Sequence, residues 1–156
     1  MLFRSGTDGV SASGNMNLMR QMYVMAGLFK DARIDPEAFT AREALRAATI
    51  EGAKALLWDD EIGSLEVGKK ADLVLYDLDH IEWTPFTDPL QALVFSASSA
   101  SVRETWVNGR AVYRDGAVPG IDERALRRES RRRADAAVRR AGLMAEGVPI
   151  KTTLYD

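Results

Sequence analysis

The segment 6–9, GTDG, is the one part of the sequence whose residue types and spacing point directly to chemistry. Leu2 and Phe3 precede it, and this apolar pair favours a short strand that ends in a glycine-flanked turn. A carboxylate at the C-terminal end of a strand, as Asp8 would be, is where parallel α/β barrels carry catalytic groups. The four residues alone favour an ordinary turn. The sequence that follows them must therefore decide between a turn and a catalytic carboxylate.

The residue counts exclude several kinds of site within one chain. His80 is the only histidine, so a site built from two or three imidazoles cannot form from a single copy. A Ser-His-Asp triad would need His80 as its base, and no nucleophile-elbow sequence accompanies it. The sequence has no cysteine, which excludes disulfides, thiolate zinc sites and thiol nucleophiles.

The overall composition is that of an ordinary folded protein. Apolar residues make up 46% of the 156 residues, charged residues make up 28%, and the net charge is −2. This balance gives no reason to expect nucleic acid or an anionic membrane as a partner. No apolar run approaches the ~20 residues that span a bilayer, and the N-terminal residues lack the pattern of a signal peptide. We therefore expect a cytoplasmic location, with which the lack of cysteine is compatible.

The elements that must position Asp8 begin with helices, which are predicted over the first third of the chain. Methionines recur every three residues from Met16 to Met25, which predicts an amphipathic helix over about 16–30 with these side chains on its core face. A soft-metal or adaptable binding surface is the alternative interpretation of this stripe. Thr40 and Glu43 have the spacing of a capping box, so a second helix, with a face of small residues, should begin there.

From residue 62 onward the pattern changes to strands. Residues 71–78 alternate in a way that predicts a strand. Residues 104–113 predict a β-hairpin, because Asn108 and Gly109 tolerate the positive φ angles of a two-residue type I′ turn. A short helical segment over 91–95 should lie between these strands. The loop 96–101 could hold an anion with its hydroxyls, but a connection of small residues between domains is favoured.

The last predicted element is a helix over about 122–141, in which arginines outnumber acids. Binding of this helix to a phosphate backbone is one interpretation. A solvated helix is favoured, because its charges have the spacing for i,i+4 ion pairs. The candidate partners are Arg124, Arg128, Arg131 and Arg132 with Asp122, Glu123, Glu129 and Asp135.

In chain order, GTDG, the Met-rich helix, REALRAATIEGAKALL, IGSLEVGKKADLVLYD, DPLQALVFSASSASV and ETWVNGRAVYRDG resemble the C-terminal part of the amidohydrolase superfamily of metal-dependent hydrolases. The most similar branch contains the deaminases and chlorohydrolases that act on amino-substituted nitrogen heterocycles. The resemblance covers residues 6–116 and is most specific in GSLEVGKKADLV.

This resemblance implies an α/β fold. Residues 1–58 would be the end of a TIM (β/α)8 barrel, with its last strand and helices, and residues 59–118 would be part of the small β-sandwich beside it. Residues 119–156 would form an arginine-rich helix and tail. Asp8 would be both a catalytic residue and a ligand of the catalytic divalent metal, zinc or iron. The reaction would be hydrolytic deamination or dechlorination of a small heterocycle.

The family's other metal-site residues come from earlier strands: a His-x-His pair, a glutamate or similar group, and two further histidines. None has a counterpart in this sequence, so the isolated chain should bind no metal tightly and should be inactive. We expect a homo-oligomer, or association with a missing N-terminal portion, because a partial barrel leaves apolar surface and strand edges uncovered. A non-catalytic association module is the alternative, and the retained Asp8 favours the enzyme.

Overall fold

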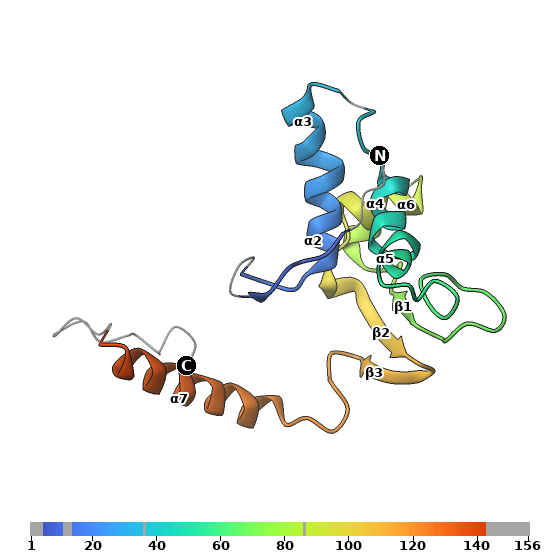
Figure 1. Ribbon diagram of the computed structural model, residues 1–156. Helices are drawn as coiled ribbons and strands as arrows, with labels where there is room; N and C mark the ends of the chain where they lie inside the picture. Colours follow the sequence, from blue (N-terminus) through green and yellow to red (C-terminus); the bar gives the residue numbers. More distant parts are fainter. Residues whose placement is uncertain (1–4, 11–13, 36, 86, 143–156) are drawn as a thin grey trace. The chain divides into compact units, whose positions relative to one another are not determined.

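The computed structural model describes residues 5–10, 14–35, 37–85 and 87–142. They fall into two compact units, one ending at Pro119 and the other beginning at Gly120 (Figure 1). The strand predicted around Leu2 and Phe3 lies outside the described residues. No helix in the described ranges combines the length and the apolar character that crossing a membrane would need.

One helical stretch opens the first unit. It consists of α2 (Leu18–Tyr23), a π-helical turn η1 (Val24–Leu28) and α3 (Phe29–Arg33). The side chain of Asn17 caps it by accepting a hydrogen bond from the backbone N–H of Arg20 at 3.1 Å. It ends where Ile34 adopts a left-handed φ of 53°. The predicted helix over 16–30 is therefore confirmed, with later limits and a π-helical turn that the periodicity did not indicate.

The methionine stripe divides at the Asn17 cap. Met22 is buried, and Met19 and Met25 pack partly buried against the same cluster. Met16 lies before the cap and is 70% exposed. The prediction of a core-facing stripe is thus right for the three methionines within the helix and wrong for Met16, because that residue precedes the first helical turn.

The second helical pair is α4 (Ala41–Ala48) and α5 (Ile50–Ala55). The capping box is confirmed: the N–H of Thr40 donates to Glu43 Oε2 at 2.8 Å, and the N–H of Glu43 donates to Thr40 Oγ1 at 3.2 Å. The helix breaks at Thr49, whose φ and ψ of −122° and −101° are not helical. The small-residue face is therefore shared between two short helices.

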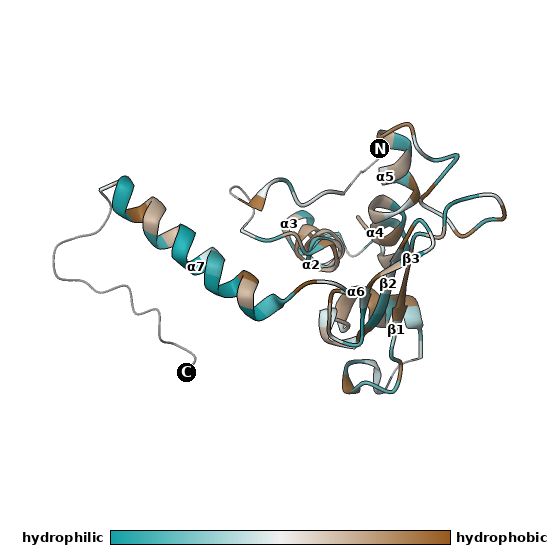
Figure 2. Cartoon of the chain, turned by 90° about the horizontal axis from the view of Figure 1, so that it is seen from below, coloured by the Kyte–Doolittle hydropathy of each residue, from teal (hydrophilic) through white to brown (hydrophobic). Residues whose placement is uncertain are grey.

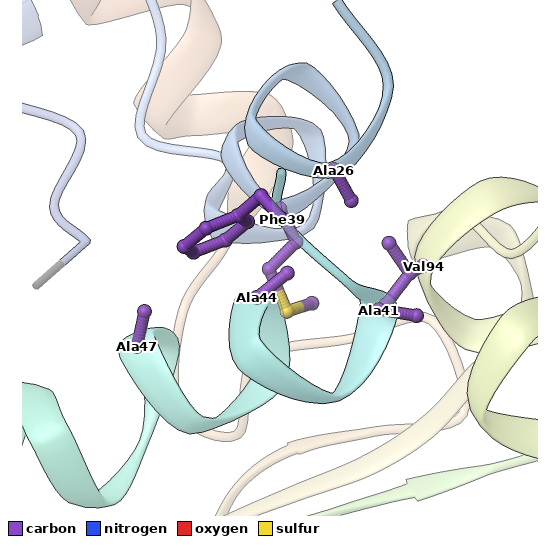
Figure 3. Close-up of a cluster of buried hydrophobic side chains, with 7 residues drawn as sticks. Ala26, Phe39, Ala41, Ala44, Ala47 and Val94 are labelled. Carbon is purple, nitrogen blue, oxygen red and sulfur yellow. The ribbon is translucent and has the colours of Figure 1, made fainter. Parts of the chain in front are cut away.

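The core of this unit forms where α2, η1 and α4 meet α6 (Pro89–Phe95). Alanines on α4 let the neighbouring helices approach closely, and Phe39, from the loop before α4, fills the remaining space. Figure 3 shows Val94 of α6 beside Ala41. The buried members are Met22, Ala26, Phe39, Ala41, Ala44, Ala47 and Val94.

A three-stranded antiparallel sheet completes the first unit, in the order β1 (Leu73–Tyr76), β2 (Val102–Val107) and β3 (Arg110–Arg114). Asn108 and Gly109 join β2 and β3 with φ angles of 49° and 73°, so the predicted type I′ hairpin is confirmed. Two short 3-10 helices, η2 (Ile81–Trp83) and η3 (Ser99–Ser101), lie between the strands in sequence. Within the described ranges, β1 and β3 are the two edges of the sheet.

The second unit contains α7 (Glu123–Arg140), which Asp122 caps, so the predicted last helix is confirmed. Most residues of this helix are hydrophilic (Figure 2). Glu129 pairs with Arg132 and Arg133, each at 2.7 Å, and Glu123 pairs with Arg127 at 3.5 Å. Of the four arginines predicted to form ion pairs, Arg132 has a carboxylate partner among the described residues of α7. The observed pairs have i,i+3 or i,i+4 spacing, and two of them use Arg127 and Arg133, which were not among the predicted partners.

Candidate functional site

Asp8 lies in an exposed turn of the first unit. Its φ of 57° is in the left-handed region, which aspartate tolerates better than most residues. Its Oδ1 accepts a hydrogen bond from the N–H of Gly9 at 2.6 Å, and Thr7 Oγ1 donates to its carbonyl oxygen at 3.2 Å. The turn is held to the helices by Ser5, whose N–H donates to the carbonyl oxygen of Ala47 at 3.1 Å. The carboxylate is therefore oriented by its own turn and open to other groups.

A metal ion would need more ligands than Asp8. Tight zinc sites use three or four protein side chains. The described residues contain no cluster of three or more histidine, cysteine, aspartate or glutamate side chains that could hold a metal ion. They do not form a complete zinc or iron site, and Asp8 fits such a site only as one ligand among several.

A large apolar groove adjoins this turn. It has a volume of about 1050 Å³, and Ser5 and Gly6 lie at its lining together with parts of α2, α4, α5, β1 and β2. Asp72 is the only acid that lines it in the described part of the chain, and this carboxylate accepts a hydrogen bond from the N–H of Asn108 at 2.6 Å. The groove has few polar groups directed at one point, so it does not resemble a preformed pocket for a polar small molecule.

Lys69 ties together the loop between α5 and β1. Its Nζ donates to the carbonyl oxygen of Asp59 at 2.5 Å and to Ser64 Oγ at 2.7 Å, and its side chain is only 13% exposed. The carboxylate of Glu66 lies 3.4 Å from the same Nζ. Hydrogen bonds from Ser64 and then from Lys69 lower the pKa of Glu66 below its ordinary value. The sequence had indicated only a turn here. The one signal for these contacts was the position of Lys69 inside GSLEVGKKADLV, the segment that carries the most specific resemblance.

Gly63, in the same block, packs against α5. Its φ is 90°, and a β-carbon there would lie 2.7 Å from Ala53 Cβ and 3.0 Å from Ile50 Cα. At the end of the block, Asp72 and Ala71 hold the β2–β3 turn, since Ala71 accepts a hydrogen bond from the N–H of Gly109 at 3.1 Å. The residues that carry most of the resemblance therefore shape the fold.

Glu82 is a further carboxylate held by several partners. Its oxygens accept hydrogen bonds from Ser98 Oγ at 2.5 Å and from the Ser98 N–H at 3.0 Å. Both bonds lower the pKa of Glu82, and the bond from the Ser98 hydroxyl has the larger effect. His80 Nδ1 lies 3.6 Å from the same carboxylate and caps η2. Ser98 ties the loop 96–101 to η2. The loop lies within the first compact unit, so the predicted connection of small residues does not join the two units.

Comparison with known proteins decides the family. Residues 3–112 match the model of the amidohydrolase family. The chain belongs to the amidohydrolase family. It is 37% identical over 135 residues to the 5-methylthioadenosine/S-adenosylhomocysteine deaminase of Thermoanaerobacter pseudethanolicus, which covers 86% of this chain and 31% of the deaminase. It is 36% identical over 142 residues to the S-triazine hydrolase of Gordonia rubripertincta, which covers 88% of this chain and 30% of that enzyme.

A solved amidohydrolase structure agrees with these matches. The crystal structure of an adenosine deaminase from Xanthomonas campestris with bound zinc aligns with a TM-score of 0.81 and 34% identity, covering 85% of this chain and 30% of the deaminase. The chain therefore spans about a third of the length of the relatives that it matches. This coverage fits the prediction that it corresponds to one portion of an amidohydrolase. The α/β fold class is confirmed, and the family recognition made from the motifs is confirmed as well.

Proposed function

We propose that this chain is the C-terminal part of an amidohydrolase that removes an amino group or a chloride from a small nitrogen heterocycle by hydrolysis. The observation that carries this proposal is the match of one continuous segment to deaminases of adenosine derivatives and to a triazine hydrolase. The rings of both substrate classes carry electron-poor carbons flanked by nitrogen, which a water-derived nucleophile can attack. Such a reaction is hydrolysis of a carbon–nitrogen bond other than a peptide bond, or its chloride equivalent.

Asp8 is the residue that we propose takes part in the chemistry. Its carboxylate is exposed, and its turn is anchored beside the apolar groove. In the proposed enzyme it is one ligand of a divalent metal, and it accepts a proton from the attacking water. The bound metal would supply Lewis-acid activation of that water. Its remaining ligands must come from outside the described residues, because these contain no suitable cluster.

The same proposal assigns the three parts of the chain. Residues 1–58 are the end of a (β/α)8 barrel, residues 59–118 are part of a small β-sandwich, and residues 119–156 are a C-terminal helix and tail. Support comes from the order of the elements: helices α2 to α5 precede residue 58, and strands β1 to β3 follow it, with α6 between β1 and β2. The change of compact unit at Gly120 also agrees with the last boundary.

A graft tests the enzymatic proposal. Residues 1–156 would replace the matched 30% of the Xanthomonas campestris adenosine deaminase. We expect the folded graft to release ammonia from adenosine derivatives or chloride from a chlorotriazine, and to lose this activity when a chelator removes the metal. The unmodified deaminase serves as the control for the assay. A folded, metal-loaded graft that releases neither product would contradict the proposal and favour the non-catalytic association module.

A further inference from the structure

Helix α7 concentrates positive charge in a chain whose net charge is −2. Residues 123–140 contain eight arginines and three acidic residues, so the helix has five positive charges in excess. Exposed charges are screened beyond about 8 Å at physiological salt, so a partner on α7 responds mainly to the charges of the helix itself. The net charge of the whole chain therefore does not decide what this helix can bind.

The ion pairs of α7 neutralise part of this charge. Arg132 and Arg133 share Glu129, and Arg127 pairs with Glu123. Four of the other five arginines are exposed and form no ion pair with the described residues. These four, which we call the arginine face, are Arg124, Arg128, Arg131 and Arg139.

The arginine face follows one side of the helix. Its members are separated by steps of four, three and eight residues, which keep the side chains within roughly 80° of one another at 3.6 residues per turn. From Arg124 to Arg139 the face extends about 22 Å at 1.5 Å per residue. Asp135 is the one acid of the described helix on this side. Leu126 and Ala137 lie on the opposite side, so a contact through these apolar residues leaves the arginine face in solvent.

The chemistry of this face suits phosphate. Every basic residue of α7 is an arginine, whose guanidinium can form two parallel hydrogen bonds to phosphate oxygens. A nucleic acid offers phosphates in a continuous row, about 3.4 Å apart along each strand of a duplex, which an extended face can follow.

An anionic lipid surface is the alternative polyanion. Helices that bind there bury aromatic and large apolar side chains in the boundary between headgroups and acyl chains. Helix α7 has no aromatic residue, and its apolar residues other than alanine are Leu126 and Val138. Its composition therefore favours a nucleic acid over a membrane.

We propose that the arginine face of α7 binds the phosphate backbone of a nucleic acid without reading its sequence. Each arginine neutralises one phosphate and releases the counterions condensed around it. The sequence favours a solvated helix with paired charges, and among the described residues that pairing extends to three of the eight arginines. This binding goes beyond the proposed enzymatic function and does not depend on it.

Binding of the 156-residue chain to a fluorescein-labelled duplex DNA of about 20 base pairs tests the proposal, with fluorescence anisotropy as the readout. We expect the logarithm of the association constant to fall with the logarithm of the salt concentration at a slope of about −3.6, which corresponds to four neutralised phosphates. The face variant combines Arg124→Gln, Arg128→Gln and Arg131→Gln, because glutamine favours a helix about as well as arginine does. It should weaken binding on the order of tenfold or more and reduce the slope to about −0.9.

The matched control combines Arg127→Gln, Arg132→Gln and Arg133→Gln, which remove the same charge from the paired arginines. This control should weaken binding by less than about threefold, since these arginines already have carboxylate partners. Equal losses in the two triple variants would overturn the proposal, because binding would then follow net charge alone. A wild-type chain that does not bind the duplex at about 50 mM salt would overturn it as well.

Two further measurements separate the helix fold and the lipid alternative. Lysine at the three positions of the face variant keeps the charge, so this triple variant should retain a slope of about −3.6. A slope near −0.9 with lysine would contradict phosphate neutralisation by the arginine face. Vesicles of phosphatidylserine and phosphatidylcholine are the second probe. Tighter binding to these vesicles than to the duplex would overturn the proposal and assign the face to an anionic membrane.

Discussion

Asp8 is the residue on which the proposed chemistry depends. Its backbone conformation allows a substitution by asparagine that should not disturb the fold. Asparagine tolerates the left-handed φ that Asp8 adopts, and it keeps the size of the side chain. In an active graft, Asp8→Asn should lower kcat by ~10²–10⁴-fold, the usual contribution of a positioned general base. Steady-state kinetics at saturating metal would measure this loss.

His80→Ala is the matched control for this experiment, since His80 caps η2 and lies beside Glu82. We expect it to change the rate little. Near-normal turnover of the Asp8→Asn graft would show that the GTDG turn serves the fold and not the reaction.

Gly63 shows how a single atom can constrain the packing of the first unit. An alanine at this position would place its β-carbon 2.7 Å from Ala53 Cβ, and the backbone would still have to adopt a φ of 90°. Gly68 has a similar φ of 97° with open space around it, so Gly68→Ala isolates the cost of the backbone conformation. We expect Gly63→Ala to lower the free energy of unfolding by about 1–3 kcal/mol more than Gly68→Ala, because of overpacking. Urea denaturation of both variants would measure the difference, and equal losses would contradict this account.

At the scale of elements, α7 depends on ion pairs along its own surface. Hydrogen bonds from Arg132 and then Arg133 lower the pKa of Glu129 to about 2. A carboxylate with a lowered folded-state pKa stabilises the fold above its unfolded pKa, near 4.5, and loses this contribution as the pH falls toward 2. The helicity of residues 123–140, followed by NMR chemical shifts, should therefore decrease between about pH 4.5 and 2.

Glu129→Gln is the control for this pH dependence, because glutamine keeps the length of the side chain and does not ionise. The variant should have less helix at neutral pH and a smaller change on acidification. High salt should reduce the difference between the two proteins, since exposed ion pairs are screened. An unchanged acid transition in Glu129→Gln would assign the effect to the other acids of this helix.

At the scale of the whole molecule, the proposed enzyme needs groups that this chain does not supply. The sequence contains one histidine and no cysteine, and the described residues hold no metal-binding cluster. We expect purified chain to show no turnover above ~1 s⁻¹, the low end of ordinary enzymes. The assay would add zinc, iron or manganese to the chain with adenosine, guanine, cytosine and aminotriazine substrates. Chelator-sensitive turnover above this rate in homogeneous protein would contradict the prediction.

The sequence by itself determined the features that depend on a few neighbouring residues. Thr40 and Glu43 form a capping box through contacts three residues apart, and Asn108 with Gly109 forms a type I′ turn by backbone preference alone. The order of the motifs determined the family for the same reason, since each motif is a continuous segment. These local signals located the helices and the hairpin and made Asp8 a candidate, but they did not indicate the π-helical turn or the helix break at Thr49.

Only the tertiary structure decided which distant groups meet. Lys69 donates a hydrogen bond to the carbonyl oxygen of Asp59, and Ser98 donates one to Glu82, which is sixteen residues away in sequence. Gly63 must be glycine because α5 packs against it. No periodicity or turn preference encodes such pairs, because they depend on how whole elements pack and on which side chains that packing shields from water. The same reason applies to the apolar groove, because its lining residues come from helices and strands that are far apart in the sequence.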